Sequence, residues 1–214
     1  MRIGFIGAGR IGSNLARRFV LAGHEVLLSF ARDANELEEK ARTLGPHASA
    51  GTPAQAAQFG DVVVLSVPWA AIGEALAQAG SLAGKLVIDT TNPFTDSGLA
   101  PTEGLTSAQF NQRRIPGARL VKSYNTLTSG FQATSAGRAG ADRVVIFYVA
   151  DDKDAGAIVA RLIDESGFAP VSLGGLADST PMEAPRRSGA VYGEEYHQAE
   201  AKAFADDWLR KRRQ

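Results

Sequence analysis

The sequence predicts an α/β protein with a doubly wound, mostly parallel sheet and a short, mainly helical C-terminal extension. Short β-branched runs alternate with amphipathic segments from the first residues onward. Several runs are apolar along nearly their whole length, which is typical of parallel strands covered by helices on both faces. A glycine-rich turn joins the first run to the first helical segment. Together these patterns predict βαβ crossovers packed around one sheet.

The predicted strands are apolar runs bounded by turn residues. They cover residues 2–6, 25–30, 61–67, 85–90, 118–124, 143–149 and 169–173. A shorter run at 47–51 is a further candidate. Residues 92–104, "NPFTDSGLAPTEG", are rich in Pro, Gly, Thr and Asp, so we expect a long surface loop there.

Apolar residues at helical spacing predict helices between these strands. The stripes are Ile11, Leu15, Phe19 and Ala22, then Leu37, Ala41 and Leu44, then Ile72, Leu76 and Ala79, and finally Ala155, Ile158, Val159, Leu162 and Ile163. Gly23 and Gly167 follow two of these stripes, where C-terminal caps are expected. The alternation stops near residue 174, and a last helix is expected at roughly 194–212. We therefore predict a main domain at 1–175 and an extension at 176–214 packed on it.

The composition limits the classes of partner. Lys plus Arg and Asp plus Glu both number 23, so the net charge is zero and no overall field favours nucleic acid or an anionic membrane. No apolar run is long enough to span a bilayer, and the first residues lack the apolar segment of a secretory signal. The chain has no cysteine, and its acids and histidines show no metal-ligand spacing. We expect a cytoplasmic protein with a small-molecule partner and no nucleic acid, membrane or metal.

The turn "GAGRIG" places Gly7, Gly9 and Gly12 in the spacing G-x-G-x-x-G between a strand and a helix. The first glycine allows a tight turn, the second lets a pyrophosphate approach the backbone, and the third lets the helix pack on the strand. The helix N-terminus then attracts the phosphates. This context predicts a Rossmann-type dinucleotide-binding domain, and a merely tight turn is the alternative.

The end of the second strand, "SFARD", indicates which dinucleotide is bound. Arg32 lies about where the residue that contacts the adenosine ribose is expected, and Ser29 is the first polar side chain of the stretch. A hydroxyl and a guanidinium suit a 2′-phosphate, because hydrogen bonds to charged groups are strong. Asp33 is expected to cap the helix that starts near residue 35, although it leaves open whether NAD(H) is accepted. NADP(H) is the favoured cofactor.

Three further strands end in residues that suit a ligand site, because ligands of open α/β sheets lie beyond the carboxyl ends of the strands. Asn92 and Asn125 are amides that suit a nicotinamide carboxamide, and local turn formation is the alternative. Pro68 makes its turn rigid. Trp69 and Phe94 are candidates for an aromatic wall, although packing is the simpler explanation for them. Lys122 is a candidate proton donor, but pairing with an acid is favoured.

The segments "FIGAGRIGSNLARRF", "SFAR", "VVVLSVPW", "VIDTTNPF" and "VKSYNTL" together resemble the NADPH-dependent reductases of the deazaflavin coenzyme F420 and the oxidoreductase domains of membrane-bound metalloreductases. The resemblance covers about residues 1–175. It implies hydride transfer between NADP(H) and a deazaflavin or flavin ring. The implied phosphate contacts are Ala8, Arg10 and Ile11, the implied 2′-phosphate contacts are Ser29 and Arg32, and the implied nicotinamide neighbours are Val67, Pro68, Asn92 and Asn125.

The chain departs from that family in two places. Many members carry a hydroxyl directly before the arginine, where this chain has Ala31, and the tail after residue 179 does not match well. The tail residues Arg186, Arg187 and Tyr192 are candidates for binding an acidic acceptor or, in a homodimer, the neighbouring subunit.

The favoured hypothesis is an NADP(H)-dependent oxidoreductase acting on a deazaflavin, a flavin or a similar redox partner. Its catalytic residue is unknown, with Asn125 and Lys122 as candidates. The alternatives are a non-catalytic NADP(H)-binding sensor or partner-binding module, and a small carbonyl or imine reductase. The sequence identifies neither the acceptor nor the direction of the reaction.

Replacing Arg32 with alanine tests the predicted cofactor preference. Arg32→Ala should weaken NADPH binding by roughly 1.5–3 kcal/mol, the typical contribution of a hydrogen bond to a charged group, and should leave NADH binding nearly unchanged. Titration of both cofactors against the variant measures this difference. Equal losses for NADPH and NADH would contradict the prediction.

Overall fold

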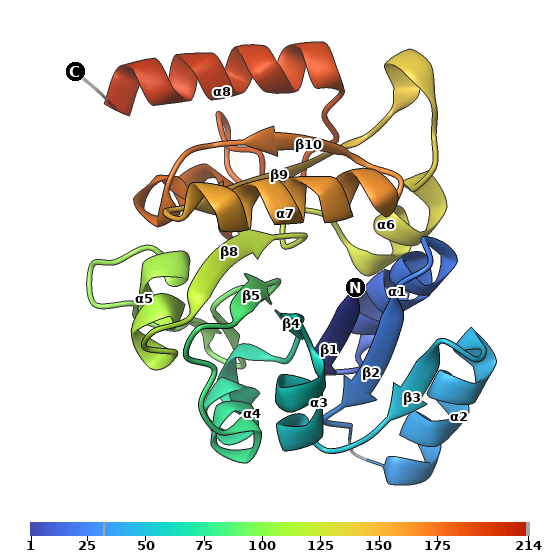
Figure 1. The fold of residues 1–214 in the computed structure, drawn as a ribbon. Helices are drawn as coiled ribbons and strands as arrows, with labels where there is room; N and C mark the ends of the chain where they lie inside the picture. The colour runs from blue at the N-terminus through green and yellow to red at the C-terminus, as the bar shows by residue number, and fades with distance from the viewer. Residues whose placement is uncertain (32, 213–214) are drawn as a thin grey trace.

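The computed structural model describes residues 1–31 and 33–212, in which one large sheet is covered by helices on both faces (Figure 1). The eight strands of this sheet are β1 Arg2–Ile6, β2 Glu25–Ser29, β3 Ala48–Ala50, β4 Val62–Leu65, β5 Leu86–Asp89, β8 Arg119–Ser123, β9 Val145–Ala150 and β10 Ala169–Ser172. Their spatial order is β10-β9-β8-β5-β4-β1-β2-β3. Each predicted strand is present with its ends shifted by two residues at most, and the short candidate at 47–51 is confirmed as β3.

The order of the strands shows that the sheet is doubly wound. The chain passes from β1 to β2 and β3 on one side, then returns to the other side of β1 for β4, β5 and β8. All of these neighbours pair in parallel. The direction of winding therefore changes between β1 and β4, where a ligand site is expected beyond the carboxyl ends of the strands.

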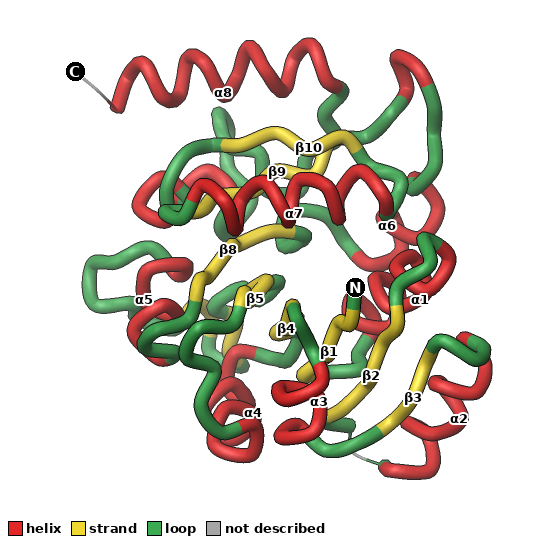
Figure 2. Tube along the Cα trace, in the orientation of Figure 1, coloured by secondary structure: helices red, strands yellow, loops and turns green. Residues whose placement is uncertain are grey.

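Helices cover both faces of the sheet, as the red segments show (Figure 2). Their bounds are α1 Arg10–Leu21, α2 Ala34–Leu44, α3 Pro53–Phe59, α4 Ile72–Ala79, α5 Ser107–Arg114, α6 Ser129–Ser135, α7 Lys153–Glu165 and α8 Gln198–Arg212. Buried side chains of α1, α2 and α7 pack on one face, and those of α3, α4 and α8 pack on the other. The predicted helical stripes of α1, α2, α4 and α7 are confirmed, except that Ala22 is exposed and lies at the C-cap of α1.

Three short helices were not predicted, although two of them carry a readable signal. Thr52 with Gln55 and Thr106 with Gln109 form capping boxes at the starts of α3 and α5. Threonine followed three residues later by glutamine is a known sequence signature of a helix start. α6 has only the cap of Thr128, which accepts a hydrogen bond from the Phe131 amide. These helices are too short to show a clear apolar stripe.

The predicted loop at 92–104 is partly wrong, because it contains a small antiparallel hairpin. β6 Phe94–Thr95 pairs with β7 Gly98–Leu99 outside the main sheet. Two residues per strand are too few to form a detectable alternating pattern. The hairpin leaves the Phe94 side chain 51% exposed.

The last two strands run in the opposite direction from the other six. β9 pairs with β8 antiparallel, and β10 follows β9 in parallel. The apolar runs of β9 and β10 predicted buried strands but contained no information on direction. Because of this reversal, the chain leaves β10 near the starting ends of the parallel strands, and it can then cross the sheet face toward their carboxyl ends.

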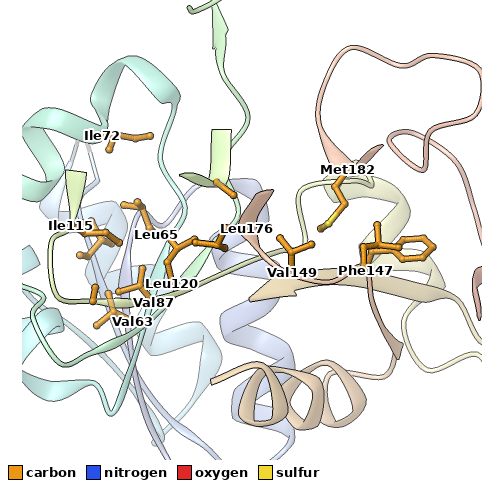
Figure 3. Packing of buried hydrophobic residues seen from close by; sticks show 14 of the residues in the cluster. Val63, Leu65, Ile72, Val87, Ile115, Leu120, Phe147, Val149, Leu176 and Met182 are labelled. Atoms are coloured by element: carbon orange, nitrogen blue, oxygen red, sulfur yellow. The ribbon is translucent and has the colours of Figure 1, made fainter. Parts of the chain in front are cut away.

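The C-terminal extension follows that path and contributes to the core. It begins with 3₁₀ turns at Leu176–Asp178 and Thr180–Met182. Leu176 and Met182 are buried among residues of β8 and β9 such as Leu120, Val149 and Phe147 (Figure 3). The last helix starts at Gln198 rather than near 194, because Tyr196 and His197 still pair with the backbone of Val144 and Val145. Among residues 1–31 and 33–212, no helix is long and apolar enough to cross a membrane.

Candidate functional site

The glycine turn between β1 and α1 is shaped by contacts that leave no room for side chains. Gly7 has φ +112°, and a Cβ atom at this position would lie 2.2 Å from the Ser66 carbonyl oxygen, in the turn after β4. A Cβ atom on Gly12 would lie 2.1 Å from the Gly7 carbonyl oxygen. The first glycine therefore lets two backbones touch, and the third lets α1 pack on the turn, as predicted.

The middle of the turn is open toward the space beyond the sheet. A Cβ atom on Gly9 would meet nothing within 4 Å. Gly9 is also the N-cap of α1, and no side chain of the described residues caps this helix. The amides of the first helical turn, including those of Arg10 and Ile11, have no partner within the helix by geometry. An exposed, uncapped helix start beside an open backbone suits a pyrophosphate.

At the end of β2, the position of Ser29 differs from the expected contact with a 2′-phosphate. The Ser29 side chain is fully buried, and its hydroxyl donates to the Phe5 carbonyl at 2.7 Å. Ser29 therefore ties β2 to β1 inside the sheet, and its expected contact with a phosphate is not supported by this geometry. Arg32 lies outside the residues that the structure describes. Asp33 is confirmed as the N-cap of α2, because its carboxylate accepts from the Asn35 amide at 2.8 Å.

The turns after β5 and β8 are joined by their two asparagines. The side-chain amide of Asn92 donates to the backbone carbonyl of Asn125 at 2.9 Å. The side-chain amide of Asn125 donates to Asn92 Oδ1 at 3.1 Å. Asn125 also donates to the Met182 carbonyl of the extension at 2.7 Å. Since a carbonyl only accepts, this contact fixes which end of the Asn125 amide is the nitrogen. The two predicted residues are thus brought together.

One atom of this amide pair is left without a partner. Asn125 Oδ1 is buried and accepts no hydrogen bond from any described residue. A buried acceptor without a donor is costly, so such atoms usually have a ligand or solvent partner. The amine of a nicotinamide carboxamide is a donor of the right kind. The open Gly9 and this acceptor together show that the site fits NADP(H).

The residues that follow β4 lie beside the glycine turn. Val67 is buried, and its side chain approaches the position of a Cβ atom on Gly7 at 2.9 Å. Pro68 is exposed at the start of the 3₁₀ turn Trp69–Ala71. Both lie beside the switch point, where the resemblance places the nicotinamide, and neither supplies a polar side chain.

Tyr124 adds backbone strain directly before Asn125. Its φ is +58°, which is rare for a residue with a bulky side chain. The ring is fully buried, and its hydroxyl pairs with Ser166 at 3.0 Å. Burial raises the pKa of the Tyr124 hydroxyl well above its usual range. The buried ring thus holds the backbone in the conformation that presents Asn125, as strained residues at ligand sites often do.

Lys122 lies beneath this turn in a buried network. Its side chain is fully buried, and the ammonium donates to Asp89 Oδ2 at 3.2 Å and to the Thr91 carbonyl at 2.7 Å. Asn111 donates to the same carboxylate at 2.9 Å, and the Thr91 amide donates to its other oxygen. Lys122 is therefore not a proton donor in the groove. It stabilises the turn at 89–92, as the favoured pairing hypothesis predicted.

Trp69 and Phe94, the candidates for an aromatic wall, do not stack on each other, because the two rings have different neighbours. Trp69 stacks on Phe110 with ring centroids 5.8 Å apart, and the Arg114 guanidinium lies 4.8 Å from the Trp69 ring centre. Phe94 instead lies 6.4 Å from Tyr192 of the extension. Trp69 is thus a packing residue, and Phe94 gains a partner that is distant in sequence.

A groove of about 400 Å³ connects these elements. It is lined by Ile11 at the start of α1, by Asn92 and the residues from Tyr124 to Ser129, and by three residues of the extension, Arg186, Tyr192 and Gly193. A second hollow, of about 280 Å³, lies between β10 and α8 and contains none of the predicted site residues. The extension therefore forms one wall of the groove at the strand ends.

The tail residues have distinct roles. Tyr192 lines the groove, and its hydroxyl bonds to no other described residue; burial raises the pKa of this hydroxyl, so it stays protonated at neutral pH. Arg186 is held by Glu194 at 2.6 and 2.9 Å, which compensates its charge. Arg187 donates to the carbonyls of Thr180, Glu183 and Pro185 within the extension, so it is structural. Homodimerisation through the extension stays a prediction.

In the part of the chain that the structure describes, no three histidine or acidic side chains gather as a metal site.

Comparison with known proteins identifies related chains. Residues 2–93 match the family model described as "NADP oxidoreductase coenzyme F420-dependent". A hypothetical protein from Sinorhizobium meliloti has 31% identity and a TM-score of 0.81, with 92% of this chain and 96% of that chain covered. An Arthrobacter protein, provisionally assigned as an F420-dependent NADP reductase, has 25% identity and a TM-score of 0.70, with 97% and 91% covered.

A curated relative is larger than this chain. The metalloreductase STEAP3 of Rattus norvegicus is 24% identical over 186 residues, which are 86% of this chain. The chain spans only 36% of the length of that metalloreductase.

The buried position of Lys122 gives a stability test. Lys122→Met should lower the free energy of unfolding by about 3–5 kcal/mol, because it leaves the Asp89 carboxylate buried without its cation. Urea unfolding measures the change, and adding Asp89→Asn should recover part of it. Lys211→Met, which removes an exposed pair with Asp207, serves as the control and should change stability little. Unchanged stability in Lys122→Met with loss of turnover would instead restore Lys122 as a catalytic candidate.

Proposed function

We propose that this chain, whose residues 2–93 match the family model described as "NADP oxidoreductase coenzyme F420-dependent", transfers a hydride between NADP(H) and a deazaflavin- or flavin-type redox partner. The observation that carries the proposal is the groove that joins the start of α1 to the buried, unpaired Oδ1 of Asn125. One end of this groove suits phosphates and the other suits a carboxamide. A second substrate then has to approach from the side of the extension.

The protein contributes binding and orientation to this reaction. Bound NADP(H) supplies or takes up the hydride, and the nicotinamide and the partner ring carry the chemistry themselves. The glycine turn and the α1 amides hold the pyrophosphate. Asn125 and Asn92 orient the carboxamide, and their mutual hydrogen bonds keep both amides in place. The extension limits the access of water to this end of the groove.

Tyr192 is positioned to contact the second substrate. Its backbone amide donates to the Pro181 carbonyl, and the next amide, of Gly193, donates to the Thr126 carbonyl at 2.8 Å. These bonds fix the ring at the groove beside Phe94. A rigid aromatic pair next to a carboxamide site supports a planar ring as acceptor, since aromatic contacts favour flat partners. The protonated hydroxyl of Tyr192 adds a hydrogen-bond donor.

The two alternative functions, a sensor and a small carbonyl or imine reductase, predict different results when NADPH is mixed with a panel of acceptors. A sensor would bind NADPH tightly without oxidising it in the presence of any acceptor. A carbonyl or imine reductase would oxidise NADPH with small carbonyl compounds and not with ring acceptors. The metal-reducing activity named for the larger relative belongs to that protein. We further propose a cytoplasmic location, which the absence of cysteine supports.

A panel of acceptors tests the proposed function. The purified chain is mixed with NADPH and with a deazaflavin, free flavins, and small carbonyl and imine compounds, and NADPH absorbance is followed. We expect oxidation with a deazaflavin or flavin and little with the small compounds. Tight NADPH binding without turnover by any acceptor would overturn the proposal.

Tyr192 variants test the acceptor side with the best acceptor from that panel. Tyr192→Leu should raise the KM for the acceptor about 3- to 10-fold, because an aromatic contact contributes roughly 0.5–1.5 kcal/mol. The Kd for NADPH should not change. Tyr192→Phe is the matched control, which keeps the ring and removes only the hydroxyl. A parallel loss of NADPH affinity in Tyr192→Leu would show that the groove itself had collapsed.

A further inference from the structure

A lysine that no sequence pattern identified lies at the rim of the glycine turn. The Lys40 side chain, in α2, donates from Nζ to the Ala8 carbonyl at 3.3 Å. Ala8 is the residue between Gly7 and Gly9, so an ammonium group is held next to the part of the turn that is open to a ligand. The 32 positions that separate Lys40 from Ala8 explain why the sequence did not connect them.

The packing of α2 sets the position of this ammonium. The helix begins directly after the end of β2, where Asp33 caps it, and it buries Leu37 and Ala41 against the sheet. Side chains of a helix tilt toward its N-terminus, so the stem of Lys40 extends back toward the carboxyl end of β2. Lys40 is half-buried there, and its head reaches the level of the glycine turn.

The ammonium is only partly satisfied by the protein. The Ala8 carbonyl also accepts the Ser13 hydroxyl at 2.9 Å, so it is shared between two donors. An ammonium has three hydrogens to donate, and the described residues provide Lys40 with this one long contact and no carboxylate in ion-pair range. A carbonyl neutralises none of the charge. Lys40 is thus a cation beside an open site, with donors left for an anion.

An anion is expected at this place if the cofactor is NADP(H). In a Rossmann-type fold the adenosine ribose lies between the glycine turn and the end of the second strand. Of the two expected 2′-phosphate contacts, Ser29 is buried with its hydroxyl bonded to the Phe5 carbonyl. In addition, Ala31 stands where many members of the resembled family carry a hydroxyl. We propose that Lys40 binds the 2′-phosphate and contributes to the selection of NADP(H) over NAD(H). This inference rests on the proposed function, because it takes the groove to bind a dinucleotide.

Binding titrations of the whole chain test the role of Lys40 without any acceptor. The Kd values of NADPH and NADH are measured by nicotinamide fluorescence for the unaltered chain, Lys40→Met, Lys40→Arg and Lys85→Met. Lys85 is the matched control, because its side chain also donates to a backbone carbonyl, that of Gly60 at 2.8 Å. It directly precedes β5, so it lies at the starting ends of the parallel strands, away from the glycine turn. Repeating the titrations at higher salt measures the charge contribution.

We expect Lys40→Met to weaken NADPH binding about tenfold and NADH binding less than about twofold, as for loss of one charged hydrogen bond. Lys40→Arg should keep most of the preference, Lys85→Met should keep all of it, and the salt dependence of NADPH binding should decrease in Lys40→Met. Equal losses for both cofactors would show that Lys40 only tethers α2 to the turn, and no loss would show that it is a bystander; either result overturns the inference. Failure of the unaltered chain to bind either dinucleotide would instead overturn the proposed function.

Discussion

The contact between two backbones at the centre of the sheet is the constraint on which the site depends. The turn after β1 touches the turn after β4 at Gly7 and Ser66, with no room for a Cβ atom between them. Gly12 brings α1 against the same turn, so the start of the helix lies directly above the switch point of the sheet. Any side chain at these glycines would separate the strands or displace the helix, and the anion-binding end of the groove would be lost.

The opposite end of the groove depends on buried polar groups rather than on close packing. Asp89, Lys122 and Asn111 satisfy one another below the turns, and Asn92 and Asn125 pair above them. In a buried network each missing partner is costly, so nearly complete satisfaction holds the turns rigid. The exception is Asn125 Oδ1. Among the side chains of these five residues it is the acceptor without a described partner, and Asn125 lines the groove, so a ligand donor is expected there.

The reversal of β9 and β10 links the extension to the site. Because these strands run against the others, the chain leaves the sheet at the far edge and crosses its face before it reaches Asn125 and Thr126. Met182 and Val191 are buried on the way, so hydrophobic burial anchors the segment that carries Tyr192. The wall of the groove on the acceptor side is therefore part of the core, and its geometry is fixed before a substrate arrives.

Local periodicity and turn chemistry encode the sheet, the glycine turn, the Asp33 cap and the strand-end asparagines, so these features could be predicted from the sequence. The sequence predicted the wrong environment for Ser29 and left the neighbours of Trp69 and Phe94 open, since the direction in which a side chain faces and its partners depend on packing. Folding sets the direction of β9 and β10 and the pairing of Lys122 with Asp89. It also brings Tyr192 to the groove and Lys40 to the glycine turn. These are contacts between residues far apart in the chain, and no local pattern records them.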